Sequence, residues 1–321
     1  MKTNITETLI IPESFADQRL DQALAQLLPA YSRTQIKNWL DDGSLLINGK
    51  TAKGKTKVKG NEAVTLNATL KAEEKWQPEA IALPIVFEDE SFIIINKPVG
   101  LVVHPGAGNK NSTMLNAILH HVPESALLPR AGIIHRLDKD TSGLLVIAKT
   151  PEAFKSLTHQ LKKREISREY QAIVYGAMIS GGVVDAPIDR HPIERKRMSV
   201  SETGRHAVTH YRIAEKYRSH TRLAVKLETG RTHQIRVHMS HIHHPIVGDS
   251  IYGGRVKLAK GMSNELISLL RGFKRQALHA CALGFHHPTT DEWVKFEAPL
   301  PDDMQTLIRA LREDTKKGNE Q

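Results

Sequence analysis

Cysteine and long apolar runs are scarce in this chain of 321 residues. The one cysteine, Cys281, excludes an internal disulfide and is typical of a protein from a reducing compartment. No stretch approaches the roughly 20 apolar residues that a membrane-spanning helix needs. Residues 1–11 also lack the basic and then apolar run of a secretory signal. We therefore expect a cytoplasmic protein without a membrane segment.

Positive charge is in surplus. The net charge is +10 at pH 7, and the pI of the sequence is about 9.6. Such a surplus favours a polyanionic partner, with nucleic acid as the first candidate. The alternative is a basic protein whose charges are simply solvated, and composition alone does not decide between the two.

The first quarter of the chain has the pattern of a separate small domain. Four leucines recur at helical spacing over residues 20–28, with Asp17 before them as a candidate cap. Ser32 and Gln35 have the spacing of a capping box, and Gly43 is a plausible end for the helix that they start. Beyond it, Asn48-Gly49 is a strong hairpin signal, and a strand is expected over residues 63–66.

Basic residues concentrate in this small domain. Seven of them lie between Arg33 and Lys59, against two acids, for a net charge of +5 over that segment. We expect Arg33, Lys37, Lys53 and Lys55 to contact an RNA backbone, although a solvated lysine-rich loop is the alternative. The pattern over residues 17–66 resembles the S4 domain, a small RNA-binding module, through its Arg-Leu-Asp opening, its Ser-Arg helix and its Asn-Gly hairpin.

A polar stretch over residues 71–79 reads as a linker and suggests domains over 1–75 and 76–321. In the second domain, strand candidates outnumber helix candidates and are mostly joined by short turns. Helices are expected over residues 112–120, 151–163, 232–241, 263–270 and 302–312. We therefore predict an α+β domain with a mixed, largely antiparallel sheet. The polar residues from Asp314 onward are expected to be disordered.

The most informative segment is HRLDKDTSGLLV, residues 135–146, a charged loop between two apolar strand candidates. Asp138 lies between Arg136 and Lys139, so its ionised form is favoured. An ionised carboxylate suits a nucleophile or a base. A tight turn with local ion pairs is the alternative that spacing alone leaves open.

This segment is similar to the signature of the pseudouridine synthases that modify large-subunit rRNA, in the class with the His-Arg-Leu-Asp motif. Further matches follow in the expected order: Ile95 to Pro98, Val103 to Gly106, Arg168 to Tyr170, Glu228 to His238, and His244 to Asp249. With the N-terminal domain, the resemblance covers nearly the whole chain.

The resemblance implies roles for four residues. Asp138 matches the essential aspartate, Tyr170 the tyrosine that stacks on the target base, and Arg231 the arginine that pairs with the aspartate. Arg136 matches the residue that fills the gap left by the flipped nucleotide. Whether Asp138 attacks C1′ or removes a sugar proton stays open. The implied reaction gains and loses no atom, so no cofactor is expected.

Five histidines, His233, His238, His241, His243 and His244, lie within twelve residues. His238 and His241 have a spacing that places them on one helical face, which makes a metal site conceivable. No cysteine is near, and no acidic ligand completes the set. We therefore expect no metal.

The expected substrate is the rRNA of the large subunit or its precursor particle, bound by a monomer, with target uridines in a hairpin loop. Two other classes of protein compete with this interpretation. One is a non-catalytic RNA-binding or ribosome-assembly protein that retains an enzyme fold. The other is a glycoside-cleaving enzyme, which usually needs a second carboxylate as its acid.

Overall fold

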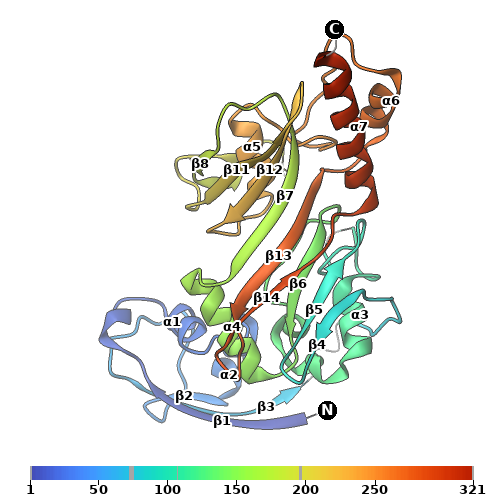
Figure 1. Ribbon diagram of the computed structural model, residues 1–321. Helices are drawn as coiled ribbons and strands as arrows, with labels where there is room; N and C mark the ends of the chain where they lie inside the picture. The colour runs from blue at the N-terminus through green and yellow to red at the C-terminus, as the bar shows by residue number, and fades with distance from the viewer. Residues whose placement is uncertain (1, 72–75, 107, 195–196, 320–321) are drawn as a thin grey trace.

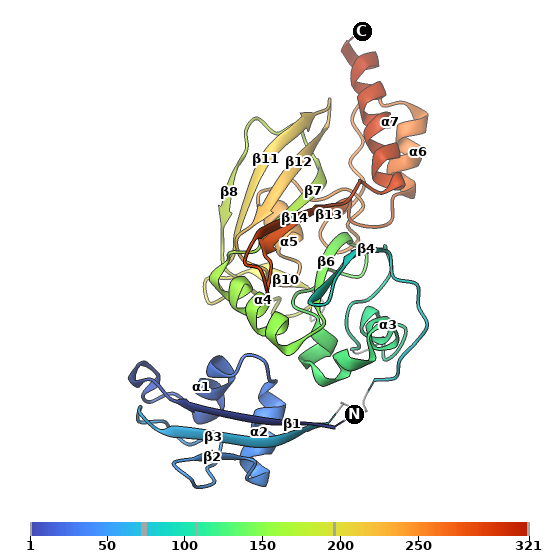
Figure 2. The same ribbon diagram turned by 60° about the horizontal axis from the view of Figure 1, so that its bottom comes forward.

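The computed structural model describes residues 2–71, 76–106, 108–194 and 197–319. Figures 1 and 2 show a small N-terminal sheet with two helices, drawn in blue, and a larger part built around one long sheet. The C-terminal helices lie at the end of the molecule opposite to the blue domain in both views. None of the helices in the described ranges is long and apolar enough to cross a bilayer.

The N-terminal domain is an antiparallel sheet in the order β1 (Lys2–Ile10), β3 (Ala63–Lys71), β2 (Leu45–Ile47). Helices α1 (Leu20–Leu27) and α2 (Arg33–Asp42) and the short 3-10 helix η1 (Glu13–Phe15) complete it. The predicted capping box starts α2: the Gln35 backbone N–H donates to Ser32 Oγ, and the Ser32 N–H donates to Gln35 Oε1. Gly43 ends the helix in the left-handed conformation, at φ +81°.

Two local expectations for this domain need correction. Asp17 does not cap α1, because it adopts φ +64° and its N–H is bonded to the Val58 carbonyl; Arg19 takes the cap position without a side-chain bond. The Asn48-Gly49 turn forms, closed by the bond from the Ile47 N–H to the Lys50 carbonyl. However, β2 has β3 as its strand partner, and among the described residues the pairing across the turn is limited to the Ile47–Lys50 bridge.

The large sheet has nine strands in the order β4-β5-β6-β13-β7-β12-β11-β8, with β14 paired to β13. Their bounds are β4 (Ile85–Glu88), β5 (Phe92–Lys97), β6 (Ser142–Ala148), β13 (Leu278–His286), β7 (Ser167–Tyr175), β12 (His220–Leu227), β11 (Val208–Lys216), β8 (Gly182–Asp185) and β14 (Trp293–Glu297). A two-stranded sheet joins β9 (Ile188–Arg190) to β10 (Met198–Val200). The pairing of β6 with β13 is parallel and the other described pairings are antiparallel, which confirms the predicted mixed sheet.

The expected helices are present as α3 (Met114–His121), α4 (Pro151–Lys163), α5 (Gln234–His241), α6 (Asn264–Gly272) and α7 (Asp302–Asn319). Two 3-10 turns, η2 (Pro123–Leu127) and η3 (Pro129–Gly132), precede the charged loop. The prediction of a disordered tail from Asp314 is wrong as far as Asn319, because α7 continues through it. Asp314 is buried and paired with Arg218 at 3.1 Å, which ties this last part of the helix to the domain.

A glycine sets the closest approach within the large sheet. Gly143 is the second residue of β6, just after Asp138 and its neighbours, and pairs with Ala280 of β13. Its φ is +116°, and a Cβ there would lie 2.2 Å from the Ala280 carbonyl oxygen. Any other residue would push the two strands apart. The motif glycine therefore places the loop that carries Asp138 against the middle of the sheet.

Candidate active site

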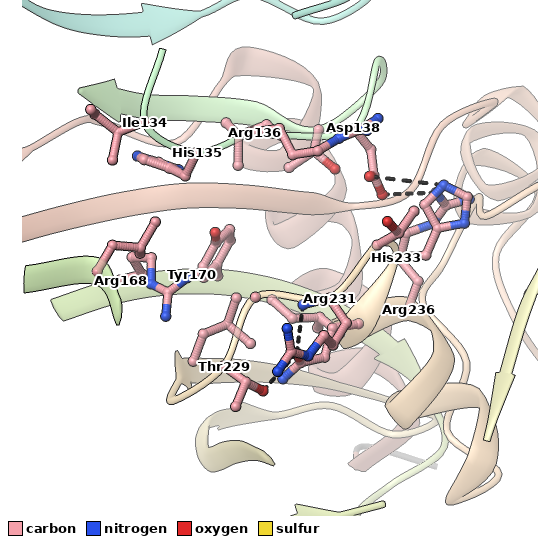
Figure 3. Close-up of a pocket in the computed structure, with 18 of the residues that line it drawn as sticks. Ile134, His135, Arg136, Asp138, Arg168, Tyr170, Thr229, Arg231, His233 and Arg236 are labelled. Atoms are coloured by element: carbon pink, nitrogen blue, oxygen red, sulfur yellow. Dashed lines mark hydrogen bonds and ion pairs between the residues drawn. The ribbon is translucent and has the colours of Figure 1, made fainter. Parts of the chain in front are cut away.

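A cavity of about 590 Å³ opens beside this loop. Its walls come from the loop before β6, from β7, and from the segment between β12 and α5. Figure 3 shows the side chains that converge on it. The structure brings together here all four residues expected at the active site: Arg136, Asp138, Tyr170 and Arg231.

A buried lysine stabilises the loop that carries Asp138 through hydrogen bonds to backbone carbonyl oxygens. Lys97 is fully buried, and its ammonium donates to the carbonyl oxygens of Pro98, Leu101 and Lys139, at 2.8, 2.9 and 2.8 Å. These three bonds use all the donors that an ammonium has. Burial lowers the pKa of Lys97 to about 8. Because one of the acceptors is the carbonyl oxygen of Lys139, the residue that follows Asp138, Lys97 fixes the backbone beside Asp138.

Asp138 is paired with Arg236 and not with Arg231, which corrects the expectation for Arg231. Arg236 Nη1 lies 2.9 Å from Asp138 Oδ2. The other edge of the same guanidinium grips Asp249, with Nε 2.7 Å from Oδ2 and Nη2 2.9 Å from Oδ1. Burial alone would lower the pKa of Arg236, but the hydrogen bonds and charges of the two aspartates outweigh it and raise that pKa.

Arg231 lies in the same pocket but in a different role. Its Nε donates to the His206 carbonyl oxygen at 3.0 Å. Burial, and then the charges of Arg205 and Arg164, lower the pKa of Arg231, so its surroundings are cationic. The physical reason is position: Arg231 lies in the segment before α5, whereas Arg236 lies in the first turn of that helix.

Tyr170 and Arg168 line the pocket from β7, where alternate residues share a face. Tyr170 is 5% exposed, and burial raises its pKa to about 12, so the hydroxyl stays protonated at neutral pH. Arg136 is exposed at the pocket. These positions suit an aromatic platform inside the pocket and an exposed cation that lines it.

His233 faces the carboxylate of Asp138. Its Nε2 lies 3.9 Å from Asp138 Oδ1, and its Nδ1 is 2.8 Å from the Tyr252 hydroxyl. The Met198 N–H donates to that hydroxyl, which leaves the hydroxyl proton for His233 Nδ1. Burial lowers the pKa of His233. The ring is therefore neutral at pH 7, with its remaining N–H on the side of Asp138.

The histidines of the 233–244 segment are dispersed among separate partners. His238 bonds to Thr209 Oγ1 and to the Ala186 carbonyl, each at 2.9 Å, and His244 bonds to the Tyr175 carbonyl. Within the described ranges, no group of three or more His, Cys, Asp or Glu side chains is arranged to hold a metal ion. The expectation of a metal-free enzyme remains a prediction.

The four basic residues expected to bind RNA in the N-terminal domain all lie on its surface. Arg33 contacts Asp21, with Nη2 3.2 Å from Oδ2 and a side chain that is 60% exposed. Lys37 lies on α2, and Lys53 and Lys55 lie in the segment between β2 and β3; all three are exposed. The structure does not bring these four residues into the pocket.

Sequence reasoning missed Arg236, Asp249 and His233 as site residues. A signal was available, since Arg236 and His233 lie in the 228–238 motif and Asp249 ends the 244–249 motif. The motifs identified the segments, but spacing did not show which arginine turns toward Asp138.

Residues 91–241 match the family model described as RNA pseudouridylate synthase, and residues 18–64 match the S4 domain. The chain is 54% identical over 315 residues to ribosomal large subunit pseudouridine synthase D of Escherichia coli strain K12, covering 98% of this chain and 97% of that protein. It is 53% identical to the protein of the same name from Vibrio parahaemolyticus, over 98% of each chain. The solved structure of human RNA pseudouridylate synthase domain containing 4 aligns with a TM-score of 0.56 and 27% identity, over 71% of this chain and 92% of that one. The chain therefore belongs to the RNA pseudouridylate synthase family, and it carries an N-terminal S4 domain.

Proposed function

We propose that this enzyme converts specific uridines of 23S rRNA to pseudouridine, with Asp138 as the catalytic carboxylate. The observation that carries the proposal is the state of Asp138 in the pocket. Its Oδ2 is held by Arg236 at 2.9 Å, while Oδ1 lies 3.9 Å from His233 Nε2, beyond hydrogen-bond distance, and the residue lines the cavity. An oriented carboxylate with a free oxygen is suited to act on the sugar of a bound nucleotide. The names of the relatives supply the rRNA substrate.

The reaction breaks the C1′–N1 bond, turns the uracil, and forms a C1′–C5 bond. One proton leaves C5 and one is taken up at N1, so atoms and electrons balance without a redox partner. The proposal therefore includes no cofactor and no metal. Asp138 acts at the sugar, either by attack on C1′ or by removal of a sugar proton. In both routes Arg236 holds the carboxylate in place.

The uridine must leave its stack to reach this pocket. Arg136, exposed at the pocket, is proposed to fill the space that the flipped nucleotide leaves. Tyr170 is proposed to stack on the uracil inside the cavity, since aromatic rings bind bases of any sequence through their faces. Together they offset part of the cost of unstacking.

RNA binding is proposed to extend beyond the pocket. Arg231, in a cationic part of the cavity wall and without a carboxylate partner among the described residues, is assigned to RNA contact instead of to Asp138. Arg33, Lys37, Lys53 and Lys55 are proposed to bind phosphates from the S4 domain. We place the domain boundary near residue 75 and the enzyme in the cytoplasm, acting as a monomer on large-subunit rRNA or its precursor particle.

A glycoside hydrolase is disfavoured by the second carboxylate of the site. An acid catalyst must be able to reach the leaving group. Asp249 is fully buried, holds both edge nitrogens of Arg236, and accepts the backbone N–H groups of Ile251 and Tyr252. It cannot serve as that acid. A non-catalytic RNA binder would have no use for a carboxylate oriented in this way.

The experiment uses transcripts of 23S rRNA hairpins and maps pseudouridine after incubation with the purified enzyme. Target uridines are expected in hairpin loops, because flipping costs less there than in a duplex. The control is the same strand annealed to its complement at equal salt, which should react poorly. Equal rates on both substrates would reject the loop preference. Absence of pseudouridine in every rRNA transcript, with activity on transfer RNA only, would reject the ribosomal assignment.

A further inference from the structure

Arg168 and Arg236 are both buried arginines at the wall of the pocket, but in the described part of the chain Arg168 lacks the carboxylate partners that Arg236 has. It is 6% exposed, and one bond is present on its guanidinium, from Nη2 to the Glu228 carbonyl oxygen at 3.2 Å. Its Nε is buried and has no hydrogen-bond partner. Among the described residues, no carboxylate lies within ion-pair distance of it. Arg236, by contrast, has its charge offset by two aspartates.

A buried guanidinium with so few hydrogen bonds destabilises the fold unless a bound ligand supplies the missing partners. A guanidinium has five N–H donors, and a buried charge without a partner destabilises a protein. Burial lowers the pKa of Arg168, and Tyr170, the neighbouring group that would oppose this effect as a phenolate, is uncharged at neutral pH. The described residues therefore supply no anion for the Arg168 guanidinium, and a bound ligand would have to supply one.

The position of Arg168 suggests which anion completes it. Arg168 lies two residues before Tyr170 on β7, so both side chains emerge on the same face of the strand, and both line the cavity (Figure 3). The facing segment makes room for the guanidinium, because a Cβ at Gly230 would lie 2.6 Å from Nη1. A base stacked on Tyr170 would thus have an unpaired buried cation beside it.

We propose that Arg168 is a catalytic residue that stabilises the negative charge of the detached uracil; this inference rests on the proposed function. When the C1′–N1 bond breaks, both electrons stay with the base, and the charge spreads from N1 to the two carbonyl oxygens. Arg168 donates N–H groups to one of these oxygens. The negative charge of the base is lost when C5 forms its bond to C1′. The proton then lost from C5 is balanced by the proton gained at N1.

Such a contact is stronger in the transition state than with the neutral bound uridine, so it accelerates the chemical step more than it tightens binding. Removal of one preorganised donor of this kind costs about 100-fold to 1,000-fold in rate. Arg168 would then act on the base while Asp138 acts on the sugar.

The test measures the dissociation constant for a 23S rRNA hairpin and the single-turnover rate at saturating RNA. Arg168→Gln should lower the rate about 100-fold or more and change the dissociation constant less than about threefold. Arg168→Lys keeps the charge and should retain an intermediate rate. The matched control is Arg222→Gln on β12. Arg222 also has a buried Nε without a partner, but it is paired with Glu215 and does not line the cavity. This control should leave the rate unchanged.

A second substrate separates a catalytic from a structural role. In 6-azauridine the base is a stronger acid and keeps its C5–H, so the detached base needs less stabilisation. The rate defect of Arg168→Gln should shrink at least about tenfold on a hairpin with this nucleotide at the target position. An equal defect on both substrates would overturn the proposal, as would an unchanged rate on uridine.

A second result would also overturn the proposal, in favour of a phosphate contact. In that result Arg168→Gln binds the hairpin more weakly than wild type, and the two proteins bind equally once the flanking phosphates are replaced by methylphosphonates. Circular dichroism and thermal unfolding of each variant, beside Arg222→Gln, identify a loss of fold. If the wild-type enzyme isomerises no uridine in any rRNA hairpin, the proposed function fails; a failure of Arg168 alone leaves that function intact.

Discussion

The cations of the S4 domain and the buried arginine that pairs with Asp138 in the active-site pocket are arranged in opposite ways. Lys37, Lys53 and Lys55 are exposed, and Arg33 is 60% exposed beside Asp21. In the pocket, the side chain of Arg236 is 5% exposed and pairs with two carboxylates. Exposed charges release counterions and bind a backbone in a salt-dependent way, without demanding one geometry. Buried charges fix atoms in place and act where charge develops. Binding and chemistry should therefore respond separately to mutation.

The largest expected effect is on turnover, and it comes from replacing one carboxylate oxygen of Asp138 by an amide group, which should leave RNA binding intact. Asp138→Asn keeps the size of the side chain but removes the charge that a nucleophile or base requires. Turnover should fall at least about 1,000-fold, with RNA affinity within about threefold of wild type. Single-turnover mapping of pseudouridine and filter binding measure the two quantities. Ready product formation by this variant would remove Asp138 from its catalytic role.

A comparison of two arginines within the pocket gives the next largest effect. Arg236→Gln leaves Asp138 without its partner and Asp249 with an uncompensated buried charge. We expect about a 100-fold loss of rate and a loss of about 3–5 kcal/mol in the free energy of unfolding. Arg231→Gln should weaken RNA binding about three- to tenfold and leave the unfolding free energy nearly unchanged. If Arg231→Gln had the larger effect on the rate at saturating RNA, the pairing seen here would not be the functional one.

The S4 domain should give the smallest effect on chemistry. With Lys37, Lys53 and Lys55 all changed to Gln, the slope of log affinity against log salt should become shallower by about 0.7–0.9 for each phosphate that the domain no longer binds. The rate at saturating RNA should not change. The control replaces Lys274, Lys316 and Lys317, which are exposed in the α6–α7 region at the opposite end of the molecule (Figure 1). The same change in slope from both triple variants would mean that the S4 lysines have no special part in binding.

Local signals in the sequence predicted local structure well. The Ser32–Gln35 box, the Gly43 stop and the 151–163 helix are present as expected, because neighbouring residues determine them. Failures occurred where distant contacts decide. The last turns of α7 hold because Asp314 meets Arg218, almost a hundred residues earlier in the chain. Asp17 does not have its expected cap role because its N–H is bonded to Val58, on a distant loop.

The active site shows the same division. Motifs identified Asp138, Tyr170 and the arginine-rich segment, and the structure brings all of them to one cavity. The spacing of Arg231 and Arg236 could not show which one meets Asp138, because that depends on where α5 begins. The lack of a carboxylate partner for Arg168 was also invisible, since it is a property of the folded pocket alone.

The central claim is tested most directly in cells that lack this protein. Pseudouridine is mapped across the ribosomal and transfer RNAs of a deletion strain, and of the same strain supplied with the wild-type protein or with Asp138→Asn at equal abundance. The account predicts that specific pseudouridines of 23S rRNA disappear on deletion, return with the wild-type protein, and stay absent with Asp138→Asn. Return of these pseudouridines with Asp138→Asn, or an unchanged 23S rRNA map in the deletion strain, would contradict it.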